Sequence, residues 1–276
     1  MTQLNGNKNM KTQLYTIIAV LLIQFSGVAQ TNTWVTRSTW DTNALVASGT
    51  SNMAYVNTAL IPVPRMDRMT NRQALVIQRA KDAPGDYDIE FIGDSITEGW
   101  EGAGKAVWQE FYGKRKCINM GVGGDRTQHV LWRFENGQLD GIKAKVAIVM
   151  IGTNNSNTNR AGIEDNSTAD ILAGVTAIVN QIRTRQPDTK IILLGIFPRG
   201  ATFSPQRGKI LEVNQALARL DDATNIFFMD LGSKFIENDG SISPSMMHDY
   251  LHPGDAGYRI WAEATEPKIK ELLGEK

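Results

Sequence analysis

The sequence has little cysteine and no excess of either charge. Cys117 is the only cysteine among 276 residues, so an intramolecular disulfide is impossible even in an oxidising compartment. Lysine plus arginine and aspartate plus glutamate each number 29, which gives a formal net charge of +0. No basic stripe favours a nucleic-acid partner and no acidic tail favours a cationic one. We also find no internal repeat and no low-complexity tract.

Motifs that mark several other enzyme classes are missing as well. No G-x-S-x-G occurs, which disfavours an α/β-hydrolase. No G-x-x-x-x-G-K-[ST] phosphate-binding loop occurs either. The glycine-rich segment that begins at Gly121 has Arg126 in the place of the third glycine of G-x-G-x-x-G. It is therefore not a dinucleotide-binding fingerprint.

The N-terminus carries a short apolar run from Leu14 to Phe25. Lys8 and Lys11 precede it, and the small-residue stretch 26–29 follows it. A positive start, a short apolar middle and small residues at a cut site are typical of a secretory signal peptide. The run is shorter than the roughly 20 residues that a membrane-spanning helix needs. An uncleaved anchor and a buried first helix are the alternatives.

We therefore predict three segments. Residues 1–29 are predicted to be a signal peptide cleaved after Ala29, so that the protein is secreted or periplasmic without a stable membrane anchor. Residues 30–70 are predicted to form an irregular N-terminal arm, in which Pro62 and Pro64 mark extended chain. Residues 71–276 are predicted to form one domain.

Strand and helix patterns alternate along this domain. Apolar segments predict strands over 87–93, 116–122, 145–152, 190–197 and 225–231. Amphipathic patterns predict helices over 71–81, 127–135, 168–186, 205–220 and 256–273. This alternation favours a parallel, doubly wound α/β sheet. Ligands of such sheets bind outside the carboxyl ends of the strands, and unusual residues follow several of these strands.

Ser95 follows the first predicted strand and opens a helix. Its hydroxyl is expected at the ligand-binding edge of the sheet. Its backbone N–H is expected near the positive helix terminus, where a developing anion is favoured. The alternative is a plain helix N-cap serine.

Two further turns could supply hydrogen-bond donors. The glycines of the segment 121–124 follow the second strand and let the backbone approach a ligand, although a tight turn alone would also use them. Asn154 follows the third strand, where its amide could donate to an oxyanion or cap a turn.

A candidate base and acid stand together near the C-terminus. Acyl transfer by serine needs a base within hydrogen-bond reach, and that base needs an orienting carboxylate. Asp249 and His252 lie three residues apart ahead of the last helix, so one short loop could deliver both. His248 is the rival base, and a structural role for the segment remains an alternative.

These Ser, Gly, Asn and His segments together resemble the SGNH (GDSL-like) hydrolase superfamily. Further stretches are similar to the catalytic subunits of intracellular platelet-activating factor acetylhydrolase and their bacterial relatives. These stretches are 121–133, 152–155, 185–187, 194–199 and 249–252. The resemblance runs from about Tyr87 to the C-terminus. It implies a flavodoxin-like three-layer α/β/α sandwich with a five-stranded parallel sheet, and chemistry without a metal or an organic cofactor.

The resemblance also implies roles for individual residues. Ser95 would be the nucleophile, His252 the general base and Asp249 its orienting partner. The backbone N–H groups of Ser95 and Gly124 and the side-chain amide of Asn154 would form the oxyanion hole.

The function that follows is that of a serine esterase acting on short-chain esters, acetyl esters above all, of carbohydrates or other small polar molecules. The predicted export signal and N-terminal arm separate this chain from the intracellular enzymes and leave the phospholipid substrate open. A lipase or phospholipase is the second hypothesis, and it would want an apolar channel or lid. A non-catalytic flavodoxin-like binding domain is the third, and it would predict a missing nucleophile or base. The sequence leaves the oligomeric state undetermined.

Overall fold

The computed structural model describes residues 55–158 and 165–276, which contain a five-stranded parallel sheet in the order β2-β1-β3-β4-β5. The strands are β1 (Gly85–Gly93), β2 (Cys117–Asn119), β3 (Ile142–Met150), β4 (Lys190–Leu194) and β5 (Ile226–Met229). The α-helices are α1 (Thr70–Asp82), α2 (Ser95–Glu98), α3 (Lys105–Tyr112), α4 (Thr127–Glu135), α5 (Thr168–Arg185), α6 (Pro205–Leu217) and α7 (Asp255–Leu273). Short 3₁₀ helices are η1 (Thr58–Leu60), η2 (Gly99–Glu101), η3 (Ala218–Leu220) and η4 (Gly232–Phe235).

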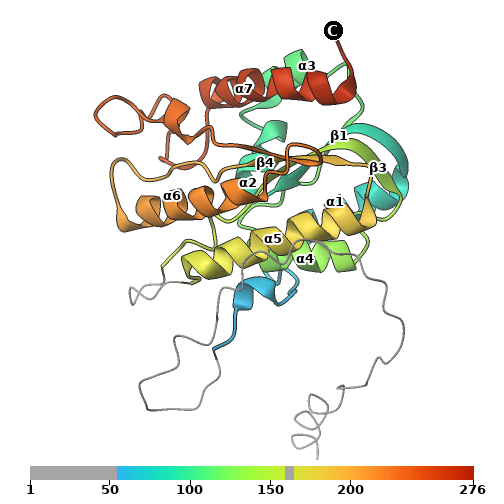
Figure 1. Cartoon of the computed structure of the whole chain (residues 1–276), viewed down its shortest axis with the longest axis horizontal. Coiled ribbons are helices and arrows are strands. Elements are labelled where there is room, and N and C mark those ends of the chain that lie inside the picture. Colours follow the sequence, from blue (N-terminus) through green and yellow to red (C-terminus); the bar gives the residue numbers. More distant parts are fainter. Residues whose placement is uncertain (1–54, 159–164) are drawn as a thin grey trace, which may run out of the picture. The chain divides into compact units, whose positions relative to one another are not determined.

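Helices cover both faces of this sheet. Helices α3 and α7 lie on one face, and α1, α4, α5 and α6 lie on the other (Figure 1). The predicted five-stranded parallel sheet and its α/β/α layering are confirmed.

Strand β3 shows why the central segment reads as a nearly continuous apolar run. Val146 and Ile148 pack into the layer formed with α3 and α7, whereas Ala147 and Val149 pack into the layer formed with α4, α5 and α6. All four side chains are buried. A strand in the middle of a parallel sheet is covered on both faces, so polar residues have no solvent face to occupy.

Strands β2 and β4 end three residues earlier than their apolar patterns predict, and β3 and β5 end two residues earlier. Side-chain hydrogen bonds follow the ends of β2 and β4. Strand β2 stops at Asn119, whose side-chain oxygen accepts the N–H of Gly121 at 2.8 Å and turns the chain. Strand β4 stops at Leu194, beyond which Asn214 on α6 accepts the N–H of Ile196 at 2.8 Å. Beyond β4 a side chain accepts the backbone N–H, whereas the chain beyond β2 still donates to β1, from Met120 to the carbonyl of Phe91 and from Val122 to that of Gly93.

The segment before α1 packs on the sheet's helical layer. Ala59 is fully buried, and its carbonyl accepts the hydroxyl of Thr127 at 2.9 Å. The N–H of Val63 donates to the carbonyl of Gln128 at 3.3 Å. The predicted signal peptide and most of the predicted arm lie outside the described residues, and the division at residue 70 stays a prediction.

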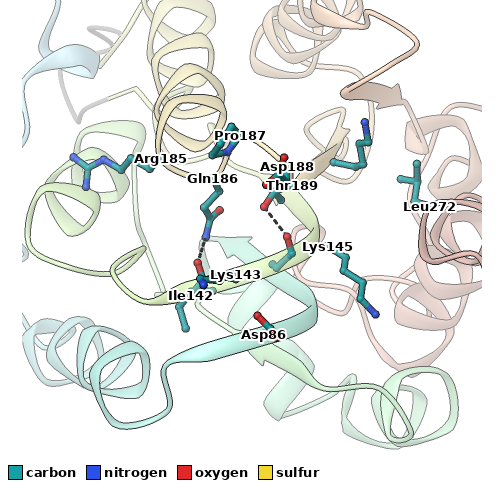
Figure 2. A pocket seen from close by; sticks show the side chains of 12 residues that line it. Asp86, Ile142, Lys143, Lys145, Arg185, Gln186, Pro187, Asp188, Thr189 and Leu272 are labelled. Atoms are coloured by element: carbon teal, nitrogen blue, oxygen red, sulfur yellow. Dashed lines mark hydrogen bonds between the residues drawn. The ribbon is translucent and has the colours of Figure 1, made fainter.

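The amino ends of the strands surround a cavity of about 680 Å³, drawn in Figure 2. The turn from α5 to β4 is tied to β3 there. The side-chain amide of Gln186 donates to the carbonyl of Ile142 at 3.0 Å, and the hydroxyl of Thr189 donates to the carbonyl of Ala144 at 2.6 Å. This end of the sheet is opposite to the edge that carries the candidate catalytic residues.

Glu90 is an acid in the middle of the sheet. It lies on β1, is fully buried, and neither carboxyl oxygen has a hydrogen-bond partner among the described residues. Burial raises the pKa of Glu90 to about 8. Near neutral pH the protonated form therefore costs less free energy to bury than the carboxylate.

Glu90→Gln should reduce the loss of stability that accompanies rising pH. The folded pKa lies above the unfolded value of about 4.3, so the native state keeps a proton that the unfolded chain has lost. The free energy of unfolding should therefore fall as pH rises from about 4.3 to about 8, by at most about 1.4 kcal/mol per pH unit. Denaturant titrations across this window should show Glu90→Gln gaining stability relative to the wild type. Glu135→Gln, at an exposed position, is the matched control. If the free energy of unfolding changes with pH equally steeply in the wild type and in Glu90→Gln, the prediction is wrong.

Candidate active site

Ser95 is the first residue of α2, directly after β1, and only Asp94 separates the strand from the helix. The Asp94 side chain caps the helix by accepting the N–H of Ile96 at 3.0 Å. Asp94 is fully buried, and burial raises its pKa to about 7. The capped helix thus begins at Ser95, which is half-buried at the carboxyl edge of the sheet.

His252 links Ser95 to Asp249. Its Nε2 lies 2.8 Å from Ser95 Oγ, and its Nδ1 lies 2.6 Å from Asp249 Oδ2. Asp249 Oδ1 also accepts the backbone N–H of His252 at 2.8 Å. Partial burial alone would raise the pKa of Asp249, but the hydrogen bonds from His252 lower it to about 2. Asp249 is therefore a carboxylate over the whole neutral range.

The loop that carries this acid and base is held in a strained turn. Tyr250 has φ 59°, a left-handed conformation that is uncommon for a residue with a large side chain. Its carbonyl accepts the N–H of Gly200 at 2.8 Å. An antiparallel bridge between Met247 and Pro253 closes the loop. These contacts keep Asp249 and His252 on the same side of the turn.

The other two histidines have different surroundings. The side chain of His248 is 77% exposed, and its Nε2 lies 4.0 Å from Asp249 Oδ2. His129 Nδ1 accepts the backbone N–H of Arg126 at 3.0 Å, and burial lowers the pKa of His129 to about 4. Of the three, only His252 is hydrogen-bonded to Ser95 within the described part of the chain.

The glycine-rich turn after β2 leaves one backbone donor unused. The N–H groups around Gly124 donate as follows: Gly121 to the side chain of Asn119, Val122 to the carbonyl of Gly93, Gly123 to the carboxylate of Glu98, and Asp125 to the carbonyl of Val122. The N–H of Gly124 has no acceptor among the described residues. Gly124 is exposed and has φ 71°, which favours glycine. Its N–H is available to a ligand.

Asn154 reaches the same turn from the end of β3. Its Nδ2 donates to the carbonyl of Asp125 at 2.9 Å, which leaves the second N–H of the amide free for another acceptor. Because β2 and β3 flank β1 in the parallel sheet, the turns that follow these strands lie at the same sheet edge as Ser95. The structure thus places all the predicted site residues at one edge.

Arg65 supports the glycine turn but carries no local sequence signal. Its Nη1 donates to the carbonyl of Gly123 at 2.7 Å, and a Cβ on Gly124 would lie 3.1 Å from its guanidinium. Arg65 also pairs with Asp125, which is fully buried and pairs with the buried Arg133. The sequence placed Arg65 in the irregular arm, because an isolated arginine says nothing about a partner 60 residues away.

Arg199 supports the Asn154 turn in a similar way. Its Nη1 donates to the carbonyl of Thr153 at 3.1 Å and to the side chain of Asn157 at 3.0 Å. Arg199 belongs to one of the stretches that carried the family resemblance, but that stretch gave it no role.

Within residues 55–158 and 165–276, no group of three or more His, Cys, Asp or Glu side chains is arranged to hold a metal ion. No helix in the same ranges is long and apolar enough to cross a bilayer.

Comparisons with known proteins identify the family. The sequence model of the GDSL-like lipase/acylhydrolase family matches residues 91–260. This chain belongs to that family. Platelet-activating factor acetylhydrolase IB subunit alpha2 of Homo sapiens is 36% identical over 231 residues, which cover 83% of this chain and 96% of the relative. The human alpha1 subunit is 33% identical over 229 residues, which cover 83% of this chain and 94% of the relative. The chain is therefore a carboxylic ester hydrolase.

Solved structures share the fold at lower sequence identity. A putative acylhydrolase from Bacteroides fragilis has a TM-score of 0.62 and 20% identity, and the match covers 76% of this chain and all of that one (100%). A catalytic mutant of Axe2, an acetylxylan esterase from Geobacillus stearothermophilus, has a TM-score of 0.53 and 20% identity over 69% of this chain and 95% of that one.

The two histidines near the C-terminus should differ sharply on substitution. Ser95→Ala and His252→Ala should abolish most ester hydrolysis while leaving the fold intact, because each breaks the hydrogen bond between nucleophile and base. His248→Ala, the matched control from the same loop, should stay within about threefold of the wild type, since its ring is exposed. Initial rates with p-nitrophenyl acetate test this, and the reverse ranking of the histidines would move the base to His248.

Asn154→Ala should lower kcat by about 10²–10³ with little change in KM, because an oxyanion donor acts mainly in the transition state. The amide also holds the carbonyl of Asp125, so unfolding should be measured in parallel. Asn180→Ala, which truncates an exposed asparagine on α5, is the control. An Asn154→Ala variant with wild-type kcat would remove this amide from the oxyanion hole.

Proposed function

We propose that this enzyme hydrolyses short-chain acyl esters, acetyl esters above all, of carbohydrates or other small polar molecules through a Ser-His-Asp triad. The observation that carries the proposal is the continuous hydrogen-bonded chain Ser95–His252–Asp249, with separations of 2.8 and 2.6 Å. A nucleophile, a base in contact with it and an ionised acid in contact with the base are what acyl transfer requires.

In the first half of the reaction Ser95 Oγ attacks the ester carbonyl carbon. His252 Nε2 accepts the serine proton as the new C–O bond forms, and the Asp249 carboxylate stabilises the resulting imidazolium. The carbonyl oxygen becomes an oxyanion. It is placed to accept hydrogen bonds from the backbone N–H groups of Ser95 and Gly124 and from the free N–H of the Asn154 amide.

The tetrahedral intermediate then collapses. His252 gives its proton to the departing alcohol oxygen, and the acyl group remains on Ser95 as an ester. A water molecule repeats the sequence: His252 removes its proton, the water oxygen attacks the acyl carbon, and Ser95 leaves with the proton that His252 returns. The carboxylic acid product is released and the free enzyme is restored.

An acetyl group is favoured by the names of the similar proteins. The curated relatives are named acetylhydrolases, and two of the structures that share the fold are an acetyl xylan esterase and Axe2, an acetylxylan esterase. A carbohydrate also suits the predicted export of the chain, because a secreted or periplasmic enzyme meets polysaccharides. The signal peptide over 1–29 and cleavage after Ala29 rest on the sequence alone, as do the arm over 30–70 and the domain over 71–276.

One structural feature favours the lipase alternative. A cavity of about 470 Å³ lies between α6 and the turns after β4 and β5, and its lining is mainly apolar. Phe203 and Leu211 line it and are strongly exposed. Its wall residue Ile196 lies against Gly152, where a Cβ would approach within 2.7 Å of the isoleucine side chain. An apolar cavity of this size suits an alkyl chain longer than acetyl.

The dependence of kcat/KM on acyl length separates the two substrates. The esterase predicts a maximum at acetyl and a steep fall by butyrate or hexanoate, because groups that do not fit are excluded sterically. A lipase predicts a gain of about 0.8 kcal/mol, or about fourfold, for each buried methylene. The measurement is kcat/KM for p-nitrophenyl esters from acetyl to dodecanoyl, beside acetylated xylo-oligosaccharides.

A substitution in the apolar cavity tests whether long acyl chains bind there. If long chains use it, Phe203→Ser should lower their kcat/KM and spare acetate, whereas Leu75→Ser, an exposed leucine on α1, should change neither. A steady gain with chain length that Phe203→Ser abolishes would replace the esterase proposal by the lipase.

A further inference from the structure

The glycine turn after β2 rests directly on the nucleophile helix. The side-chain amide of Asn119 donates to the carbonyl of Thr97 at 3.0 Å. A Cβ on Gly121 would lie 2.2 Å from the backbone nitrogen of Glu98, so only glycine allows this approach. The geometry between Ser95 and the turn is therefore set by contacts with α2 itself.

Glu98 contacts the peptide unit that precedes the one carrying the unused donor. It is the last residue of α2, three positions after Ser95, and its Oε2 accepts the N–H of Gly123 at 2.6 Å. Its side chain is 30% exposed and its Oε1 lies 3.6 Å from Arg72 Nε. Arg72 in turn donates to the carbonyl of Gly121 at 3.0 Å. The Glu98 carboxylate and the Arg72 guanidinium thus both hydrogen-bond to the same turn.

The Glu98 contact decides which glycine N–H stays free. Gly123 and Gly124 lack Cβ atoms, so their backbone can adopt several orientations at little cost. With Gly123 committed to Glu98, the N–H of Gly124 is left without an acceptor beside Ser95. Without the carboxylate, the peptide unit before Gly123 loses its acceptor, and the Gly124 N–H keeps its direction only through the hydrogen bond from Arg65 to the Gly123 carbonyl.

The negative charge of Glu98 stands close to a site where negative charge develops, and it would oppose catalysis if it were isolated. Arg72 offsets this charge. Its guanidinium also makes a bidentate pair with Glu101, and Arg79 pairs with the same acid. The charges of two acids and two arginines therefore cancel. Glu98 thus acts on the turn as a hydrogen-bond acceptor and not through its charge.

We infer that Glu98 is a positioning residue of the oxyanion hole, whose carboxylate holds the Gly123 N–H so that the Gly124 N–H points at the reacting oxygen. The inference rests on the proposed function, because it takes Gly124 to be an oxyanion donor. Glu98 itself touches neither the substrate nor the reacting atoms.

Three variants of Glu98 distinguish the effect of its hydrogen-bond acceptor from the effect of its charge. Glu98→Ala removes both, Glu98→Gln keeps an acceptor of the same length, and Glu98→Asp keeps the charge but shortens the side chain by one methylene. We expect Glu98→Ala and Glu98→Asp to lower kcat about 10- to 100-fold with KM within about twofold, which is less than the complete loss of a donor costs. Glu98→Gln should stay within about threefold of the wild type. Glu101→Gln, which alters the same arginine pair without touching the glycine turn, is the matched control.

The amide resonance of Gly124 gives a readout that fold stability alone would not move. A methylboronic acid probe forms an anionic tetrahedral adduct on an activated serine. An oxygen of this adduct takes the position of the reaction's oxyanion and can accept a hydrogen bond from an oxyanion-hole donor. In the wild type the Gly124 amide proton should shift downfield on adding the probe. The shift should be retained in Glu98→Gln and lost in Glu98→Asp, whose unfolding free energy is measured alongside.

Each outcome has a distinct meaning. Hydrolysis that persists in Ser95→Ala would overturn the proposed function. Hydrolysis that requires Ser95 but survives in Glu98→Asp with an unchanged kcat would overturn the positioning role alone. The same holds if Glu101→Gln lowers kcat as much as Glu98→Asp, or if the wild-type Gly124 amide does not respond to the probe.

Discussion

The site depends on one long-range constraint, the approach of the loop before α7 to the amino end of α2. Ser95 and His252 are 157 residues apart in sequence, yet their side chains are 2.8 Å apart. The phenol of Tyr258 on α7 donates to the carbonyl of Ile96 at 2.7 Å, which joins the two helices close to the nucleophile. A Cβ on Gly99 would lie 2.0 Å from that phenol oxygen, so α2 and α7 meet without space between them. The rest of the fold keeps this contact in place.

An aromatic cluster packs on this face of the sheet. The rings of Trp100 and Tyr258 lie 4.6 Å apart, and those of Trp100 and Trp261 lie 5.1 Å apart. Phe91 on β1 and Tyr112 on α3 extend the cluster. Such pairs contribute about 0.5–1.5 kcal/mol each beyond their area burial. The cluster thus joins β1, α3 and α7.

Three acids near the site differ in what sets their pKa values. Asp94 is buried, and burial raises its pKa to about 7 while it caps α2. Asp125 is also buried and its pKa is raised to about 6, but Arg133 and Arg65 oppose the effect of burial. Asp249 is partly exposed, and hydrogen bonds from His252 lower its pKa to about 2. The most ionised of the three is the one that faces the histidine, where a charge is useful.

The sequence by itself determined the fold class and the set of candidate groups. Apolar runs in strands depend on burial, and burial in a parallel sheet follows from the alternation of strands with helices, so five strands could be predicted from local patterns. Ser95, Asn154 and the Asp249–His252 pair stand at strand ends or before a helix, and local context was enough to single them out. Their catalytic roles remain predictions, although the structure brings them to one edge of the sheet.

Tertiary structure alone decided how these groups are oriented and supported. His248 and His252 look alike in sequence, and only the turn at Tyr250 directs one of them to Ser95. Arg65 and Glu98 have no motif of their own, because their meaning lies in hydrogen bonds to Gly123 from segments 58 and 25 residues away. The free N–H of Gly124 is likewise a property of its neighbours' bonds. Local sequence predicts burial and secondary structure, whereas the direction of a single donor depends on contacts between distant segments.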